Sequence, residues 1–244
     1  MTDSPGSTVD VRRAAERFHT RLDWLDSWHS FSFGPHRDPE NTHHGLLLVS
    51  NDDVVAPAAG FAPHPHRDME IVTWVLEGEL EHRDSAGNHG LIAPGLAQRM
   101  SAGRGITHSE TNASRDLPVH LVQMWVVPDV YEIDPGYEQR DIGDALTSGQ
   151  LVPVASGRGH DGAVAIHQHD AVLWAARLDG GAPVTLPDAP HVHLFVARGD
   201  AVLDGDGDGG VALTAGDAAR LTDAGALHIA GGPSATEILV WETA

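Results

Sequence analysis

The chain consists largely of short stretches of β-branched and aliphatic residues, separated by clusters of glycine, proline, aspartate and asparagine. The clearest stretches are residues 45–50, 71–76, 119–127, 163–166, 172–178, 191–197 and 237–241. Stretches of this length with turn-forming residues between them are typical of an all-β sandwich or barrel. In the first 140 residues only residues 11–18 carry a weak helical pattern. An all-β protein is therefore predicted.

Parts of the first half of the sequence recur in the second half. Residues 75–80 (Val-Leu-Glu-Gly-Glu-Leu) match residues 196–201 (Val-Ala-Arg-Gly-Asp-Ala), and the Ala-Pro-Gly turn at 93–95 matches Thr-Ala-Gly-Asp at 214–217. In each copy a strand reaches a glycine, a hairpin follows, and a turn of a small residue and glycine comes next. Duplication of one β-barrel unit explains this pattern. We expect the join in the stretch 135–149, which is rich in proline, glycine and aspartate.

Three segments are expected along the chain. Residues 1–10 are polar and acidic, which predicts a disordered N-terminal tail. Residues 11–140 are expected to form the N-terminal barrel, and residues 141–244 the C-terminal barrel.

The composition excludes several kinds of chemistry. The chain has no cysteine, so it has no disulfides, thiolate nucleophiles or cysteine-ligated zinc or iron–sulfur sites. All 15 basic residues are arginine, so a lysine Schiff base is impossible. Carboxylates, hydroxyls and the imidazoles of 17 histidines remain available for chemistry.

The charge and hydropathy patterns limit the partners. The formal net charge is −20 at pH 7, and no basic stripe offsets it. So acidic a surface repels phosphate backbones, and we expect no direct nucleic-acid binding. No apolar run approaches the roughly 18 residues of a membrane span, and the first ten residues do not resemble a secretion signal. We therefore expect a cytoplasmic protein that does not associate with membranes.

Two short motifs place histidine or glutamate at alternate positions. They are Pro-His-Pro-His, which contains His64 and His66, and Thr-His-Ser-Glu, which contains His108 and Glu110. Side chains two residues apart in a strand point to the same face. If both strands line one barrel interior, three imidazoles and one carboxylate converge on a common centre.

This set of donors is typical of a transition-metal site. Imidazole nitrogen with a carboxylate suits Fe, Ni, Cu, Mn or Zn, whereas Ca and Mg prefer sites made of oxygen atoms. Four such ligands leave an octahedral metal two open positions, as an oxygenase requires. A closed tetrahedral zinc site would instead be structural, and the residues alone leave both possibilities open.

Longer stretches around these motifs have a highly specific pattern. They are residues 64–70 (HPHRDME), 76–88 (LEGELEHRDSAGN) and 101–110 (SAGRGITHSE), supported by residues 24–33, 121–125 and 137–140. Over nearly the whole chain this pattern resembles the pirin family of the cupin superfamily, and most closely its bacterial branch, the pirin-like quercetin 2,3-dioxygenases.

The resemblance implies a bicupin, in which two tandem jelly-roll β-barrels pack face to face. It also implies one metal in the N-terminal barrel, held by His64, His66, His108 and Glu110, and a C-terminal barrel without metal. Fe(II) is the metal we expect, with Ni, Mn, Cu and Zn as alternatives. Family members are associated with quercetin 2,3-dioxygenase activity and, separately, with regulatory binding to partner proteins.

The favoured interpretation is an enzyme that uses O2 to open the heterocyclic ring of a flavonol. Glu110 would then serve both as a metal ligand and as the catalytic proton acceptor. The alternative is a metal-containing regulatory or redox-sensing protein that docks a partner protein without significant activity. The enzyme is favoured because a purely structural site does not explain the open coordination positions.

Other histidine and aspartate clusters are weaker candidates. His191, His193 and His228 are the candidates for a second metal site, but we expect the C-terminal barrel only to pack. His82 and Asp84 imitate half of a metal-binding triad but flank a turn, so no role is assigned to them. Residues 204–209 (Asp-Gly-Asp-Gly-Asp-Gly) resemble the start of a calcium loop, but they are better explained as a hairpin turn because no glutamate follows at position 12 of the loop.

Overall fold

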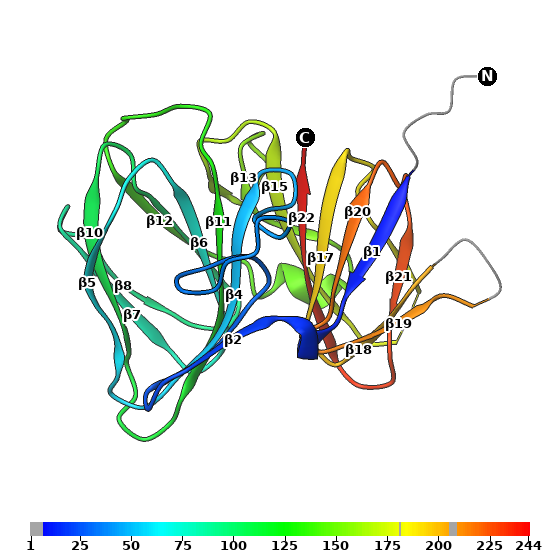
Figure 1. Ribbon diagram of the computed structural model, residues 1–244, viewed down its shortest axis with the longest axis horizontal. Helices are drawn as coiled ribbons and strands as arrows, with labels where there is room; N and C mark the ends of the chain where they lie inside the picture. Colours follow the sequence, from blue (N-terminus) through cyan, green and yellow to red (C-terminus); the bar gives the residue numbers. More distant parts are fainter. Residues whose placement is uncertain (1–6, 181, 205–208) are drawn as a thin grey trace.

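The computed structural model describes residues 7–180, 182–204 and 209–244 of the chain. The described residues form two halves that lie side by side, and each half is made of a seven-stranded and a four-stranded sheet (Figure 1). The predicted all-β fold with two tandem cupin barrels packed face to face is confirmed.

The N-terminal half is antiparallel throughout its described pairings. Its seven-stranded sheet has the order β12-β9-β6-β11-β4-β3-β2. These strands are β2 (Phe18–Arg21), β3 (Leu25–His29), β4 (Leu47–Val55), β6 (Glu70–Glu77), β9 (Leu96–Ser101), β11 (Val119–Val126) and β12 (Gly136–Asp141). The four-stranded sheet has the order β5-β10-β7-β8. Its strands are β5 (Gly60–His66), β7 (Leu80–Asp84), β8 (His89–Ile92) and β10 (Ile106–Asn112).

The C-terminal half repeats this arrangement. Its seven-stranded sheet has the order β1-β20-β17-β22-β15-β13-β14, and its four-stranded sheet the order β16-β21-β18-β19. The strands of the larger sheet are β1 (Thr8–Arg12), β13 (Val152–Ser156), β14 (Val164–Ala165), β15 (Ala171–Leu178), β17 (His191–Arg198), β20 (Ala218–Thr222) and β22 (Thr236–Thr243). Those of the smaller sheet are β16 (Val184–Thr185), β18 (Asp200–Leu203), β19 (Val211–Thr214) and β21 (His228–Gly231).

The glycines that mark the sequence repeat occupy equivalent places in the two halves. Gly78 lies between β6 and β7, and Gly199 lies between β17 and β18. Both have a positive φ, of 80° and 71°. A Cβ atom would lie 2.8 Å from the carbonyl oxygen of Pro118 at the first position and 2.6 Å from that of Ala235 at the second. Only glycine fits such a turn, and this explains why the residue recurs.

The two large sheets pack against each other and bury a shared apolar core. Alternate residues of β6, such as Trp74, point into this core, while Val75 points into the N-terminal barrel. Trp241 of β22 contributes from the opposite side. The Trp74 indole Nε1–H also donates a hydrogen bond of 2.7 Å to Glu237 Oε1 across the interface. The halves are therefore joined by a continuous core, and the seven-stranded sheet of the N-terminal half is buried on both faces.

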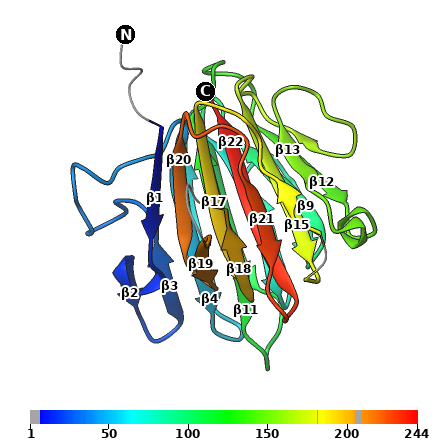
Figure 2. The same ribbon diagram turned by 90° about the vertical axis from the view of Figure 1, so that its right-hand side faces the viewer.

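The start of the chain differs from the expectation. Of the predicted disordered tail of residues 1–10, residues 1–6 lie outside the described part, but Thr8–Arg12 forms strand β1. This strand pairs with β20 of the C-terminal half, as Figure 2 shows. The weak helical pattern over residues 11–18 corresponds only to a short 3-10 helix, η1 (Ala14–Glu16), because strands occupy both of its sides. A second 3-10 helix, η2 (Ala145–Ser148), lies in the segment where we expected the join.

Two further expectations concern membrane spans and the aspartate-glycine stretch at residues 204–209. No helix among the described residues is long and apolar enough to cross a membrane. Most of the aspartate-glycine stretch that was interpreted as a hairpin turn, namely residues 205–208, lies outside the described residues.

Candidate metal centre

The first histidine pair lies on β5, at the edge of the four-stranded sheet. His64 and His66 are half-buried, while Pro63 and Pro65 between and before them are exposed. Proline has no N–H group to donate to a neighbouring strand, and an edge strand does not need one on its open side. Strand β5 therefore tolerates proline at alternate positions. The predicted alternation holds, and it places both imidazoles on the inner face of the sheet.

The neighbouring strand β10 supplies the second pair. His108 pairs directly with His64 of β5, and Glu110 pairs directly with His82 of β7. A register shift in the β5–β10 pairing lies between His108 and Glu110, and such bulges redirect side chains beside functional sites. Both His108 and Glu110 are buried, so this strand also points its polar side chains inward.

Among the described residues the candidate ligand atoms fall into two overlapping groups, each within 4.8 Å. One group holds His64, His66 and His108, and the other holds His82, His108 and Glu110. His108 is common to both groups. The structure therefore brings the three predicted histidines together, while Glu110 is grouped through His108 with a residue to which the motifs assigned no role.

Hydrogen bonds decide which nitrogen of His64 is free. Its Nδ1–H donates to the carbonyl oxygen of Ala62 at 2.8 Å, so its Nε2 carries the lone pair. This Nε2 lies 3.1 Å from Nε2 of His108. Two ligand atoms that each lie about 2.1 Å from one metal are about 3 Å apart when they subtend a right angle. The separation therefore fits two imidazoles on a common ion.

His66 completes the histidine group. Its Nε2 is buried and has no hydrogen-bond partner among the described residues. Burial, together with the neighbouring imidazoles, lowers the pKa of His66 to about 4 and that of His108 to about 3. Both rings are therefore neutral near pH 7, and a neutral imidazole is the form that binds a metal. The unpaired Nε2 of His66 and the nearby ring nitrogens of His64 and His108 form a donor set that suits a transition-metal ion.

The carboxylate of Glu110 is held in place by a chain of two hydrogen bonds. The Gln123 side-chain amide donates to Oε1 at 3.0 Å and to Oε2 at 2.8 Å. Gln123 in turn accepts a hydrogen bond of 3.1 Å from the Trp125 indole. The Trp125 ring also packs edge-on against His66, with centroids 4.9 Å apart. The buried carboxylate is thus positioned by neutral donors.

His82 is a site residue that the motifs did not identify. The sequence predicts that it flanks a turn, but the structure buries it fully on β7, where its Nδ1 lies 3.4 Å from Nδ1 of His108. Its Nε2–H donates to Asp84 at 3.2 Å. Burial alone would raise the pKa of Asp84, but the combined hydrogen bonds from Asn88 and His82 lower it. Because an ionised Asp84 accepts from His82 Nε2–H, His82 Nδ1 is free to accept from the Nδ1–H of His108. The Nε2 of His108 then carries the lone pair and faces His64.

Replacing His82 with phenylalanine is expected to weaken metal binding about 10- to 100-fold, because His108 loses the acceptor that fixes its tautomer. Competition with a chromogenic chelator would measure the affinity. Tyr137→Phe is the matched control, since the Tyr137 ring packs on His82 at 4.7 Å but its buried hydroxyl has no partner among the described residues. Equal affinities for His82→Phe and the wild type would refute this role for His82.

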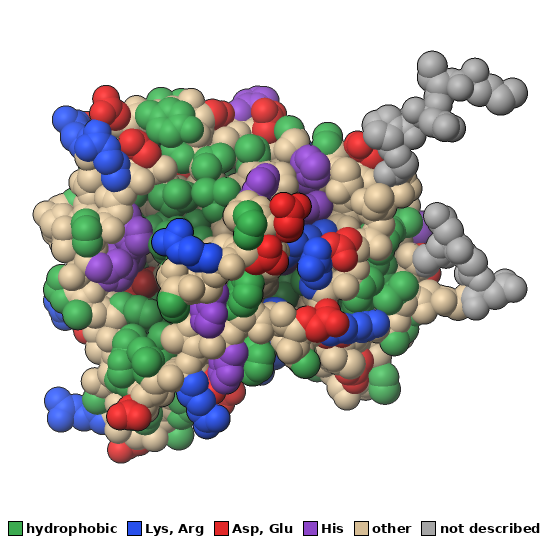
Figure 3. Space-filling model, viewed as in Figure 1, with side chains coloured by type: hydrophobic (Ala, Val, Ile, Leu, Met, Phe, Trp, Pro, Cys, Tyr) green, Lys and Arg blue, Asp and Glu red, His purple; other side chains and the backbone are tan. Residues whose placement is uncertain are grey.

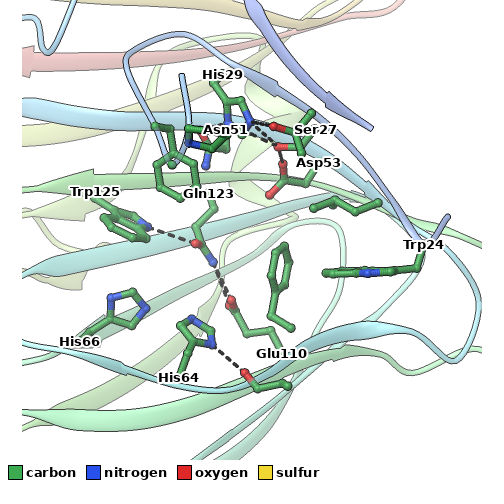
Figure 4. Close-up of a pocket in the computed structure, with 17 residues that line it drawn as sticks. Trp24, Ser27, His29, Asn51, Asp53, His64, His66, Glu110, Gln123 and Trp125 are labelled. Atoms are coloured by element: carbon green, nitrogen blue, oxygen red, sulfur yellow. Dashed lines mark hydrogen bonds between the residues drawn. The ribbon is translucent and has the colours of Figure 1, made fainter. Parts of the chain in front are cut away.

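The candidate metal ligands, which we call the metal group (His64, His66, His108 and Glu110), lie beside a cavity of about 400 Å³ inside the N-terminal half. His64, His66, Glu110, Gln123 and Trp125 line one side of it (Figure 4). Much of the remaining wall is apolar and is formed by Trp24, Leu25, Phe33, Pro35, Phe61 and Ala62. In Figure 3 histidine side chains lie beside a hollow in this half, next to hydrophobic side chains. A cavity of this volume, with an apolar wall and few polar groups, suits a small organic molecule.

The other histidines that were considered do not form a comparable group. His191 packs against His44 and His193 against Phe31, with ring centroids 5.1 and 5.6 Å apart. Both therefore lie on the side of β17 that faces the N-terminal half. His228 is exposed, and its Nδ1 lies 3.4 Å from Asp204.

The interior of the C-terminal barrel has apolar residues at the matching positions. Leu203 of β18 pairs with Ile229 of β21, as His82 pairs with Glu110 in the first barrel. Leu186 and Leu227, whose backbones share a hydrogen bond of 2.8 Å, stand where His64 and His108 pair. All four lie in or against one apolar cluster, so these positions carry no metal-ligating side chain.

Comparison with known proteins agrees with this architecture. Residues 9–126 match the Pirin family and residues 153–242 match a quercetinase C-terminal cupin domain. A Mycobacterium tuberculosis protein, provisionally named a quercetin 2,3-dioxygenase, is 58% identical over 97% of this chain and 95% of its own length. The quercetin 2,3-dioxygenase of Escherichia coli is 42% identical over 81% of this chain and 84% of its own length.

Solved structures give the same result. The crystal structure of YhhW from Escherichia coli has a TM-score of 0.89 and 37% identity, over 97% of this chain and 98% of that one. A structure of bacterial pirin YhhW in complex with nickel(II) has a TM-score of 0.87 and 36% identity, over 97% and 99%. Together with the matched family regions and the two-barrel fold, these similarities show that the chain belongs to the pirin family of bicupins.

Proposed function

We propose that the protein is a metal-dependent dioxygenase that opens the heterocyclic ring of a flavonol such as quercetin. His64, His66, His108 and Glu110 would hold one divalent transition metal, with Fe(II) expected and Ni, Mn, Cu or Zn as alternatives. The observation that carries the proposal is the group of His64, His66 and His108, with the Glu110 carboxylate grouped with His108, beside a cavity of about 400 Å³ with a largely apolar wall. The names of the relatives support the substrate class. We also propose that the protein is cytoplasmic.

The protein's own residues have distinct tasks in this reaction. The three imidazoles bind the ion, and the aromatic residues Trp24 and Phe61 cover the rings of the substrate and exclude water. When bound, the metal supplies Lewis acidity toward the 3-hydroxyl group of the flavonol and redox chemistry toward O2. Glu110, held by Gln123, accepts the proton of that hydroxyl group. Release of carbon monoxide accompanies the opening of the ring.

The test is oxygen uptake and carbon monoxide release by Fe(II)-loaded protein with quercetin. We expect both to occur in a one-to-one ratio, and to fall at least about 100-fold in His64→Ala because one of the three imidazoles is lost. His169→Ala is the control, since His169 is exposed and, among the described residues, its ring makes a polar contact only with its neighbour Asp170. Turnover in the wild type no higher than in His64→Ala would overturn the proposal.

The regulatory alternative predicts a different result in the same experiment. A protein that docks a partner without catalysis would show no carbon monoxide release with any of the five metals. It would instead be recovered with one partner protein in a manner that depends on the metal. That combined outcome would replace the enzymatic proposal.

A further inference from the structure

A second polar group lies in the same cavity, apart from the metal group. It consists of Ser27 and His29 of β3 and Asn51 and Asp53 of β4, all buried and all lining the cavity. Figure 4 shows these four side chains together, on the side of the cavity away from His64 and His66. The pairing of β3 with β4 places Ser27 opposite Asp53 and His29 opposite Asn51.

One part of this group is a directional chain of hydrogen bonds. Burial lowers the pKa of His29, so its ring is neutral and has one donor and one acceptor. His36 Nε2 lies 3.0 Å from the Thr20 hydroxyl oxygen, and this oxygen lies 2.9 Å from His29 Nε2. His29 Nδ1–H then donates to Asn51 Oδ1 at 2.9 Å. This series of hydrogen bonds fixes the orientation of the Asn51 amide and leaves its Nδ2 donor without a partner among the described residues.

The other part of the group is a carboxyl with one oxygen in use. The Ser27 hydroxyl donates to Asp53 Oδ1, whereas no described residue hydrogen-bonds Oδ2. Burial raises the pKa of Asp53 to about 7. Because Ser27 donates directly to the carboxylate and His29 is engaged by Asn51, the three side chains do not form a hydrolase triad, in which histidine lies between serine and aspartate. The arrangement is therefore suited to bind a ligand and not to activate the serine as a nucleophile.

We infer that Asn51 and Asp53 form a subsite for a phenolic hydroxyl group on the part of an aromatic substrate that is remote from the metal. The inference rests on the proposed function, since it assigns the substrate class of the same cavity. A phenolic hydroxyl is both a donor and an acceptor. Above about pH 7, where the Asp53 carboxyl is ionised, the two free polar atoms, Asp53 Oδ2 and Asn51 Nδ2, are an acceptor and a donor. The cavity therefore takes a polyhydroxylated aromatic compound, with its chelating end at the histidines.

A ligand without this hydroxyl group would cover two polar atoms of the cavity wall without pairing either of them. Quercetin and 3-hydroxyflavone share the chelating hydroxyl and oxo groups, but only quercetin has hydroxyl groups on its outer rings. We expect metal-loaded wild type to bind quercetin at least about 10-fold more tightly than 3-hydroxyflavone. Fluorescence titration gives both dissociation constants without turnover when O2 is excluded.

Asp53→Asn tests the subsite because it keeps the shape of the side chain and replaces the free acceptor with a donor. The preference for quercetin is expected to fall to within about 3-fold, with the dissociation constant of 3-hydroxyflavone unchanged. Asp52→Asn is the matched control: Asp52 is bound by Arg17 and His120 and does not line the cavity. Asn51→Leu is a second variant, which removes the donor and covers the case in which Asp53→Asn fails to fold.

Each outcome distinguishes the subsite from the proposed function. A preference that survives in both Asp53→Asn and Asn51→Leu overturns the subsite, whatever the turnover. Loss of the preference in these variants, with no carbon monoxide release from the wild type, supports the subsite and overturns the dioxygenase. Failure of the wild type to bind either flavonol overturns both.

Discussion

Glu110→Gln is expected to lower kcat with quercetin by about 10²- to 10⁴-fold, because glutamine cannot accept the proton of the substrate hydroxyl. The amide also places an N–H group where Gln123 donates to both carboxylate oxygens, so one of these hydrogen bonds is lost. Three imidazoles remain to hold the metal, and we expect protein saturated with metal to keep about one ion per chain. Oxygen consumption gives kcat, and elemental analysis gives the metal content.

The control for this substitution is Glu81→Gln. Glu81 lies on β7 near the site in sequence, but its partners are Arg83 and His89 on the surface. It carries the same loss of charge without contact with the cavity, and its kcat should stay within about 2-fold of wild type, as is usual for surface substitutions. If Glu110→Gln retained kcat within 3-fold of wild type, Glu110 would have no role as a proton acceptor. Loss of metal together with activity would instead identify it as a ligand only.

Trp74→Ala is expected to lower the free energy of unfolding by about 3–5 kcal/mol, the usual cost of deleting a buried tryptophan. The side chain is fully buried between the two large sheets, and its indole N–H is bonded to Glu237 of the other half. The substitution therefore opens a cavity in the shared core and removes a link across it. Urea unfolding followed by tryptophan fluorescence and circular dichroism measures the change.

Two variants calibrate this result. Trp74→Phe keeps most of the volume but loses the hydrogen bond to Glu237, so it should cost less, about 1–3 kcal/mol. Leu117→Ala changes an exposed leucine and should stay within about 0.5 kcal/mol of wild type. A cost below 1 kcal/mol for Trp74→Ala would show that the contact between the halves contributes little to stability. Separate unfolding transitions of the two halves would show the same.

Local patterns predicted a good part of the site. The alternation of His64 with His66 and of His108 with Glu110 implied a shared inner face, because strand side chains alternate whatever the rest of the fold does. The repeat marked by Gly78 predicted the second barrel, because the left-handed turn admits only glycine. Such features depend on a few neighbouring residues and can be recognised in one sequence.

Other features depended on which strands meet and in what register. His82 enters the metal group only because β7 pairs with β10 so that it stands opposite Glu110. The group around Asp53 exists only because β3 pairs with β4, and residues 22 to 26 positions apart then become neighbours. Strand β1 joined the opposite half for the same reason. No local spacing encodes these contacts.

By itself, the sequence determined the class of fold, the duplication and the histidine–glutamate donor set, since alternation, turn chemistry and donor type are properties of short segments. Only the tertiary structure decided that His82 supports His108, that His191 and His193 face the other half, and that a second polar group lies across the cavity from the metal group. The physical reason is that strand register is set by the burial of whole sheets, and a shift of one residue would turn every one of these side chains to the opposite face.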